Sequence, residues 1–63
     1  MSDRVDQPAV RRRRILLLQM RAYGYLGRGR WGRAARVFEK AVAIDPQRAN
    51  ARFGLGLSYQ LLG

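Results

Sequence analysis

The segment YLGRGRWGRAARVFEKAVAIDP, residues 25–46, decides the fold of this chain. Residues 27–32 satisfy the letter pattern G-x-G-x-x-G, which is typical of a dinucleotide-binding loop. Such a loop must follow a strand inside a βαβ unit of about 30 residues, with an acidic residue roughly 20 positions further on. Here the preceding residues have helical periodicity, no second strand follows, and residues 48–52 are basic. The glycines therefore indicate a bend between two helices.

After the bend, apolar residues recur at helical spacing and charged residues occupy the other side, so the pattern predicts an amphipathic helix over 30–44. Asp45-Pro46 ends it, because the residue before a proline resists the helical conformation. The apolar stripe consists of Trp31, Ala34, Ala35, Phe38, Ala41 and Val42, and the charged side of Arg30, Arg33, Arg36 and Lys40.

Before the bend, residues 8–27 are rich in good helix formers and predict a first helix. Asp6 can cap this helix, and Pro8 falls in its first turn, where a missing N–H is tolerated. Its apolar residues cover most of the circumference, so the helix should be covered on several sides. A third helix is expected over 48–62. The apolar stripe of the first helix consists of Ile15, Leu18, Ala22 and Tyr25, and Leu16, Leu17 and Met20 widen that stripe.

The spacing of these residues across both arms resembles the tetratricopeptide repeat (TPR) family, whose period is about 34 residues. Tyr59 follows Tyr25 by one such period, and Gly63 follows Gly29 by the same spacing. Arg21 and Arg52 depart from the family pattern, which has apolar residues there. The positions that carry the resemblance are Leu18, Ala22, Tyr25, Gly29, Trp31, Ala34, Phe38, Ala41 and Pro46, then Leu55, Gly56 and Tyr59.

The resemblance implies an all-α fold, an antiparallel helical hairpin followed by a third helix. It places a polar and basic, partly helical segment at 1–14, a complete repeat at 15–48 and the first helix of a second repeat at 49–63. The stretch RANARFGLGLSYQLLG, residues 48–63, also looks like the start of the second repeat in TPR-type chaperones of bacterial type III secretion.

Composition argues against catalysis and against a cofactor. The 63 residues include no Cys and no His, which removes thiolate chemistry, the commonest metal ligand and the commonest general base. The acids are Asp3, Asp6, Glu39 and Asp45, and no pair looks placed for general acid–base work. We therefore expect a protein that is not an enzyme and that holds no metal.

Lys and Arg outnumber Asp and Glu by 13 to 4, giving a net charge of +9. This excess would attract an acidic protein, a nucleic acid or an anionic surface. Lys40 is the sole lysine, so a GC-rich genome is an alternative cause. The residues expected to form a basic surface are Arg11, Arg12, Arg13, Arg14, Arg33 and Arg36.

The apolar run at residues 15–18 is far below the roughly 20 residues of a membrane span. It is also shorter than the apolar part of a secretory signal, about 7–15 residues. We expect a cytoplasmic protein with no membrane span.

The TPR resemblance implies a protein–protein interaction module that binds another chain or itself on the face made by first helices. One alternative function is nucleic-acid binding through the arginines. A second alternative is a more specific kind of protein binding, as a chaperone or adaptor of a bacterial secretion system. The residues expected to contact a partner are Leu16, Gln19, Met20, Tyr23, Leu26, Asn50, Phe53, Leu57, Gln60 and Leu61.

A chain this short has only a few kcal/mol of stability to spare. Three helices cannot cover all of its apolar side chains, and each large one left wet forgoes roughly 1.5–3 kcal/mol. We therefore expect the chain to be stable only as an oligomer or when bound to another chain. The contact should include Leu16, Met20, Tyr23, Phe53 and Leu57.

Overall fold

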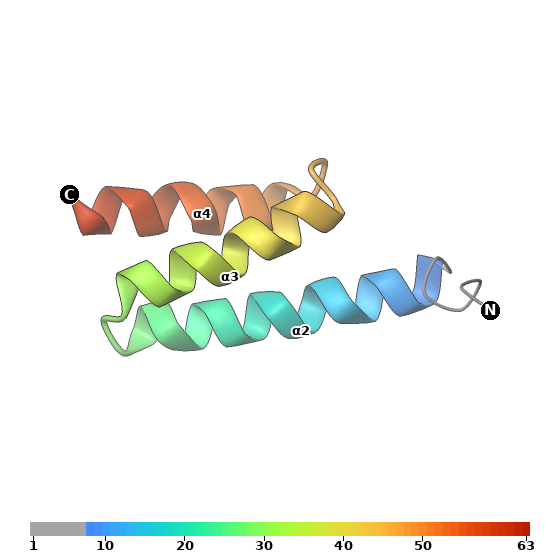
Figure 1. The fold of residues 1–63 in the computed structure, drawn as a ribbon, viewed down its shortest axis with the longest axis horizontal. Helices are drawn as coiled ribbons and strands as arrows, with labels where there is room; N and C mark the ends of the chain where they lie inside the picture. The colour runs from blue at the N-terminus through green and yellow to red at the C-terminus, as the bar shows by residue number, and fades with distance from the viewer. Residues whose placement is uncertain (1–7) are drawn as a thin grey trace.

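The computed structural model describes residues 8–63, and these form three helices and no strand. Helix α2 spans Pro8–Gly27, α3 spans Trp31–Ile44 and α4 spans Ala49–Leu62 (Figure 1). The all-α hairpin with an added helix is thus confirmed. The proposed cap at Asp6 lies outside the described residues.

Helices α3 and α4 each begin one residue later than predicted. Arg30 and Arg48 occupy their N-cap positions, and neither side chain makes a capping hydrogen bond. Helix propensity and apolar periodicity do not distinguish an N-cap residue from the first helical residue, because the cap is adjacent to the helix and fits the same periodic pattern.

The glycine-rich stretch is a tight turn between two antiparallel helices. Gly29 has a φ of +76°, a left-handed conformation that strains any side-chain-bearing residue. The amides of Arg30 and Gly29 donate to the carbonyls of Tyr25 and Leu26 at 2.9 and 3.1 Å, so the end of α2 keeps its carbonyls paired. Because a helix precedes this stretch, it is not a strand-to-helix nucleotide loop.

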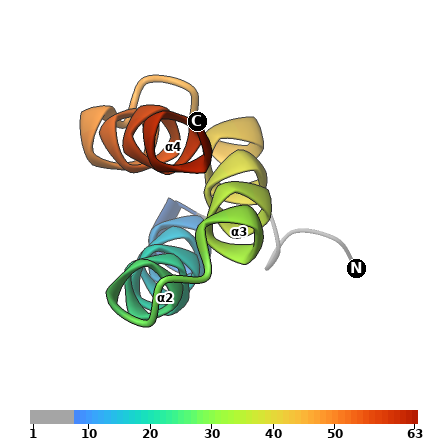
Figure 2. The same cartoon turned by 90° about the vertical axis from the view of Figure 1, so that its left-hand side faces the viewer.

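Helix α3 is the central helix of the packing. It packs along both α2 and α4, whereas α2 and α4 touch each other little. Viewed from the end, α2 and α4 both lie to one side of α3 (Figure 2). The small residues Ala34, Ala35 and Ala41 are buried in α3, so the neighbouring backbones can approach closely.

The segment between α3 and α4 is ordered by Asp45. Its backbone N–H donates to the carbonyl of Ala41, and its carboxylate accepts from the amide of Gln47 at 3.2 Å. The Arg48 guanidinium lies 3.7 Å from the same carboxylate. Together with Pro46, these contacts end α3 and direct the chain back along it as α4.

The core consists of two small clusters along α3. Phe38 is completely buried at the centre of the first, and its ring meets Tyr23 of α2 edge-on with centroids 4.9 Å apart. Phe38 thus packs α3 against α2. Trp31 is partly buried, and its ring lies beside Gly29. The first cluster contains Ala22, Ala34, Val37 and Phe38, and the second contains Ile15, Ala41 and Ala51.

Helix α4 packs against the Phe38 ring of α3 at Gly54. A Cβ atom on Gly54 would lie only 2.3 Å from ring atoms of Phe38, so the ring occupies the space that a side chain would need. One turn further along, the Ser58 hydroxyl is buried and donates to the carbonyl of Gly54 at 2.8 Å. The absence of a side chain at Gly54 thus sets the distance between the two helices.

Candidate partner-binding surface

The residues expected to bind a partner lie on α2 and α4, the two helices that pack on α3. Among them, Leu16 on α2 and Phe53 and Leu61 on α4 are apolar and exposed. Phe53 is the most open of the three, with 66% of its surface exposed. Asn50 and Gln60 are exposed polar residues, and Tyr23, Leu26 and Leu57 are partly buried. The fold therefore leaves an apolar surface on α4 beside the edge of α2.

Tyr23 joins the two helices that form this face. Its hydroxyl donates to the backbone carbonyl of Asn50 at 3.2 Å, while its ring packs on Phe38. A residue expected to meet a partner thus has a structural role in the free chain. It sets the position of the start of α4 relative to the middle of α2.

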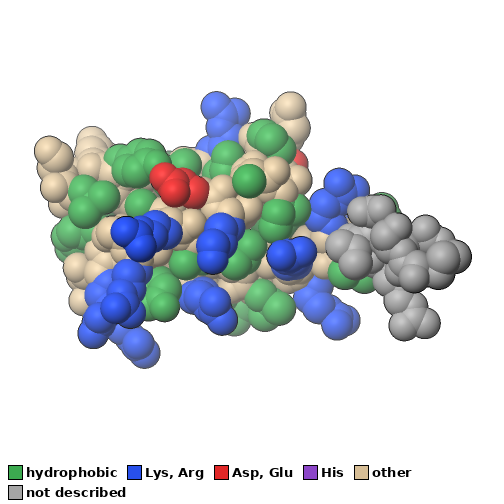
Figure 3. All heavy atoms as spheres, in the orientation of Figure 1, with side chains coloured by type: hydrophobic (Ala, Val, Ile, Leu, Met, Phe, Trp, Pro, Cys, Tyr) green, Lys and Arg blue, Asp and Glu red, His purple; other side chains and the backbone are tan. Residues whose placement is uncertain are grey.

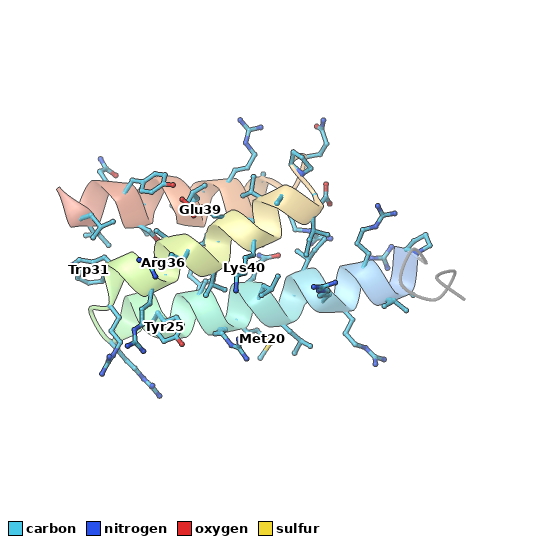
Figure 4. The ribbon with its side chains drawn as sticks, viewed as in Figure 1. Met20, Tyr25, Trp31, Arg36, Glu39 and Lys40 are labelled. Atoms are coloured by element: carbon cyan, nitrogen blue, oxygen red, sulfur yellow. The ribbon has the colours of Figure 1, made fainter. Side chains whose placement is uncertain are left out.

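Gln19 and Met20 lie differently from what their spacing predicted. Gln19 is only 5% exposed, so it is not open to a partner, and its Oε1 accepts no hydrogen bond among the described residues. Met20 is 70% exposed but lies on the edge of α2 remote from α3 and α4 (Figure 4). Gln19 is therefore covered within the chain itself, whereas Met20 is open to solvent.

All the arginines predicted to form a basic surface are exposed. Arg11 to Arg14 are consecutive in α2 and therefore point in four directions, about 100° apart. Arg33 and Arg36 lie on α3. Positive side chains are spread along α2 and α3 on the face in Figure 3, and in the same orientation Glu39 lies beside α4 (Figure 4). The positive charge is spread along α2 and α3 instead of forming one patch.

Two open hollows lie beside arginines, and sequence reasoning missed both. One, of about 300 Å³, lies where the start of α2 meets the end of α3. The other, of about 250 Å³, lies on α2 near its end. No sequence motif marks them, because each depends on how neighbouring side chains project. The first is lined by Pro8, Arg11, Arg12, Ile15, Ile44, Asp45 and Arg48, and the second by Arg21, Gly24, Tyr25 and Arg28.

Tyr59 links α4 to the outside of α3 by donating its hydroxyl to the Glu39 carboxylate. This hydrogen bond raises the pKa of Tyr59 above its ordinary value of 10.0, and desolvation and the carboxylate charge act in the same direction. A raised pKa in the folded state means that the pairing stabilises the fold below about pH 10. That contribution is lost as the pH rises through the raised pKa.

Replacing Glu39 by Ala is expected to lower the pKa of Tyr59 towards its ordinary value, because the acceptor and the negative charge both disappear. The measurement is an ultraviolet titration of the phenolate absorbance, with Tyr59→Phe identifying which transition belongs to Tyr59. Lys40→Ala, a neighbouring exposed change, is the control. An identical Tyr59 transition with and without Glu39 would contradict the pairing.

Within residues 8–63 there is no group of three or more His, Cys, Asp or Glu side chains that could hold a metal ion. None of the helices in this part of the chain is both long and apolar enough to cross a membrane. Two acidic residues lie in the described part of the chain. Glu39 pairs with Tyr59, and Asp45 pairs with the Gln47 amide and with Arg48.

These features define a class of protein, a helical-repeat scaffold in which one hairpin is followed by a helix that repeats its first arm. The sequence pattern of the TPR repeat matches residues 23–63, more than half of the chain. The chain therefore belongs to the TPR repeat family, whose members are typically non-catalytic modules for protein interaction. Comparison with curated proteins and with solved structures gave no match.

Proposed function

We propose that this chain is a non-catalytic interaction module that binds a protein chain, either a partner or a second copy, on the apolar face formed by Leu16, Phe53, Leu57 and Leu61. The observation that carries the proposal is the exposure of Phe53 on α4, at 66% of its surface. Burying an aromatic side chain of this kind contributes roughly 1.5–3 kcal/mol.

The geometry of the face fits a protein ligand better than a nucleic acid. The exposed apolar residues lie on neighbouring helices, whereas Arg11 to Arg14 surround α2 and cannot all meet one phosphate backbone. Tyr23 is engaged with Phe38 and Asn50, which leaves it unsuited to stacking on a base. The narrower role of chaperone or adaptor in a bacterial secretion system stays a prediction from the resemblance.

The first experiment measures molar mass by light scattering while the chain is diluted to nanomolar concentration. We expect self-association that weakens on dilution, with a melting temperature that falls in parallel, since binding and stability are linked. Phe53→Glu should shift dissociation to higher concentration because it places a charge in the apolar contact. Gln47→Glu makes a charge change of the same size on an exposed turn residue and is the matched control.

If the chain is monomeric, a displayed peptide library replaces the second copy as the ligand. Selected peptides should lose binding to Phe53→Glu and keep it with Gln47→Glu. A stable monomer together with a library that yields no Phe53-dependent binder would overturn the proposed function. Tight binding to a defined RNA or DNA at physiological salt, with a steep dependence of affinity on salt, would support nucleic-acid binding in its place.

A further inference from the structure

Helices α2 and α4 occupy equivalent positions one repeat period apart, yet one face differs completely between them. On α4 this face is Ala51, Gly54 and Ser58, all buried, and Gly54 lies against Phe38 of α3. One period earlier, α2 has Leu17, Met20 and Gly24. Leu17 and Met20 are 58% and 70% exposed, and we call these three residues the outer face of α2.

The outer face of α2 is open where its counterpart on α4 is covered by a helix. Figure 4 shows Met20 on the side of α2 away from α3 and α4. Leu17, Met20 and Gly24 recur at helical spacing and so form one stripe. The stripe is therefore the counterpart on α2 of a surface that a helix covers on α4.

A helix like α3 would not fit this stripe. On α4, Gly54 leaves room for the Phe38 ring, but the equivalent position on α2 holds the long side chain of Met20. Beside the stripe, Arg21 and Arg28 replace Leu55 and Leu62 of α4. The occupant must therefore offer a small residue opposite Met20 and negative charge opposite the arginines.

Charge selects between a second copy and a different partner. Helix α2 contains no Asp or Glu, Arg14 and Arg21 lie seven residues apart along one side of the stripe, and Arg28 follows directly after the helix. All three are exposed. Two copies packed through this face would bring the same arginines together, which is unfavourable because like charges repel. An acidic partner is attracted to the same surface, because its negative charges lie opposite the arginines.

The second of the two hollows described above lies beside the outer face of α2. Arg21, Gly24, Tyr25 and Arg28 line its volume of about 250 Å³. A Cβ atom on Gly24 would meet nothing within 4 Å, so the space above this residue is open. Two guanidinium groups beside an open space suit a carboxylate, because planar guanidinium groups bind carboxylates with paired hydrogen bonds.

We propose that the outer face of α2 docks an acidic amphipathic helix of another protein. The apolar side of that helix covers Leu17 and Met20, and an Asp or Glu side chain enters the hollow between Arg21 and Arg28. This surface shares no residue with the face formed by Leu16, Phe53, Leu57 and Leu61, and the proposal does not depend on the function proposed for that face.

The test uses a fluorescently labelled peptide helix with Leu and Ala along one stripe and Glu on both sides of it. The control peptide carries Lys in place of every Glu. Binding to the full chain is followed by anisotropy at physiological salt. We expect saturable binding of the acidic peptide only, weakened about tenfold or more by the double variant Arg21→Glu/Arg28→Glu, because the charge pairs become repulsive.

Matched variants separate the site from general charge attraction. Arg33→Glu/Arg36→Glu changes charge equally on α3 and should leave the affinity nearly unchanged. Gly24→Leu fills the hollow and should weaken binding, whereas Gly24→Ala adds little volume and should retain it. Helix content and melting temperature of every variant are compared by circular dichroism, and Gly24→Ala should be at least as stable as the unsubstituted chain because Ala favours helix over Gly.

Three results would overturn the proposal. The first is no saturable binding of the acidic peptide, and the second is equal weakening by the two double arginine variants. The third is loss of affinity on Arg21→Glu/Arg28→Glu with none on Met20→Gln, which would mean that the surface binds polyanions such as nucleic acid through charge alone. Phe53→Glu should not change the affinity for the acidic peptide. Failure of this proposal can therefore be distinguished from failure of the proposed function, which depends on Phe53.

Discussion

Replacing Phe38 by Ala is expected to reduce the free energy of unfolding by about 3–5 kcal/mol. Phe38 has no exposed surface, lies at the centre of the first core cluster and meets both Tyr23 on α2 and Gly54 on α4. Removing its ring therefore removes contacts between all three helices and leaves a cavity. A domain of this size has only a few kcal/mol available, so most molecules should unfold.

The measurement is the loss of helical circular dichroism during urea denaturation. Phe53→Ala is the matched control, because it removes the same side chain from a site that is 66% exposed. At a protein concentration where the chain is monomeric, that control should change stability by no more than about 0.5 kcal/mol. Equal losses for Phe38→Ala and Phe53→Ala would show that Phe38 is not the centre of the core.

The second large effect is expected at Gly54. Alanine favours helix over glycine by up to about 1 kcal/mol, so Gly54→Ala should stabilise an isolated helix. In the folded chain the new methyl group would lie 2.3 Å from the Phe38 ring, and the ring is enclosed by its neighbours. Overpacking of this kind costs about 1–3 kcal/mol, so we expect net destabilisation.

Gly56→Ala is the control within the same helix, because a Cβ atom there would meet nothing within 4 Å. It should raise the melting temperature while Gly54→Ala lowers it. Combining Gly54→Ala with Phe38→Leu should recover part of the lost stability, since the smaller side chain makes room for the methyl group. Independent, additive effects of the two changes would contradict the close approach of α3 and α4 at this point.

Helix positions followed from the sequence because the signals for them are local. Asp45-Pro46 and Gly29 are local signals for the ends of helices, and the apolar stripe of α3 identifies its buried side. The repeat of Tyr25 at Tyr59 carried the family resemblance, which agrees with the match over residues 23–63. The same signals place helix starts only to within a residue, as Arg30 and Arg48 show.

The candidate site followed from the sequence only in part. Phe53 and Leu61 are exposed on α4, where the repeat register placed them on a partner-binding face. Gln19 belongs to the same predicted set but is buried. Helical spacing assigns a residue to a side of its helix, yet a neighbouring helix covers only the part of that side that it crosses.

By itself the sequence determined three helices, their breaks and their repeat period, since backbone propensity and periodicity act within a few residues. Only the tertiary structure decided that Phe38 fills the space above Gly54, that Tyr23 reaches the backbone of Asn50 and that Tyr59 pairs with Glu39. It also decided that a hollow stays open beside Gly24. These features depend on the distance and angle between helices, which side chains far apart in the chain determine only once they are packed together.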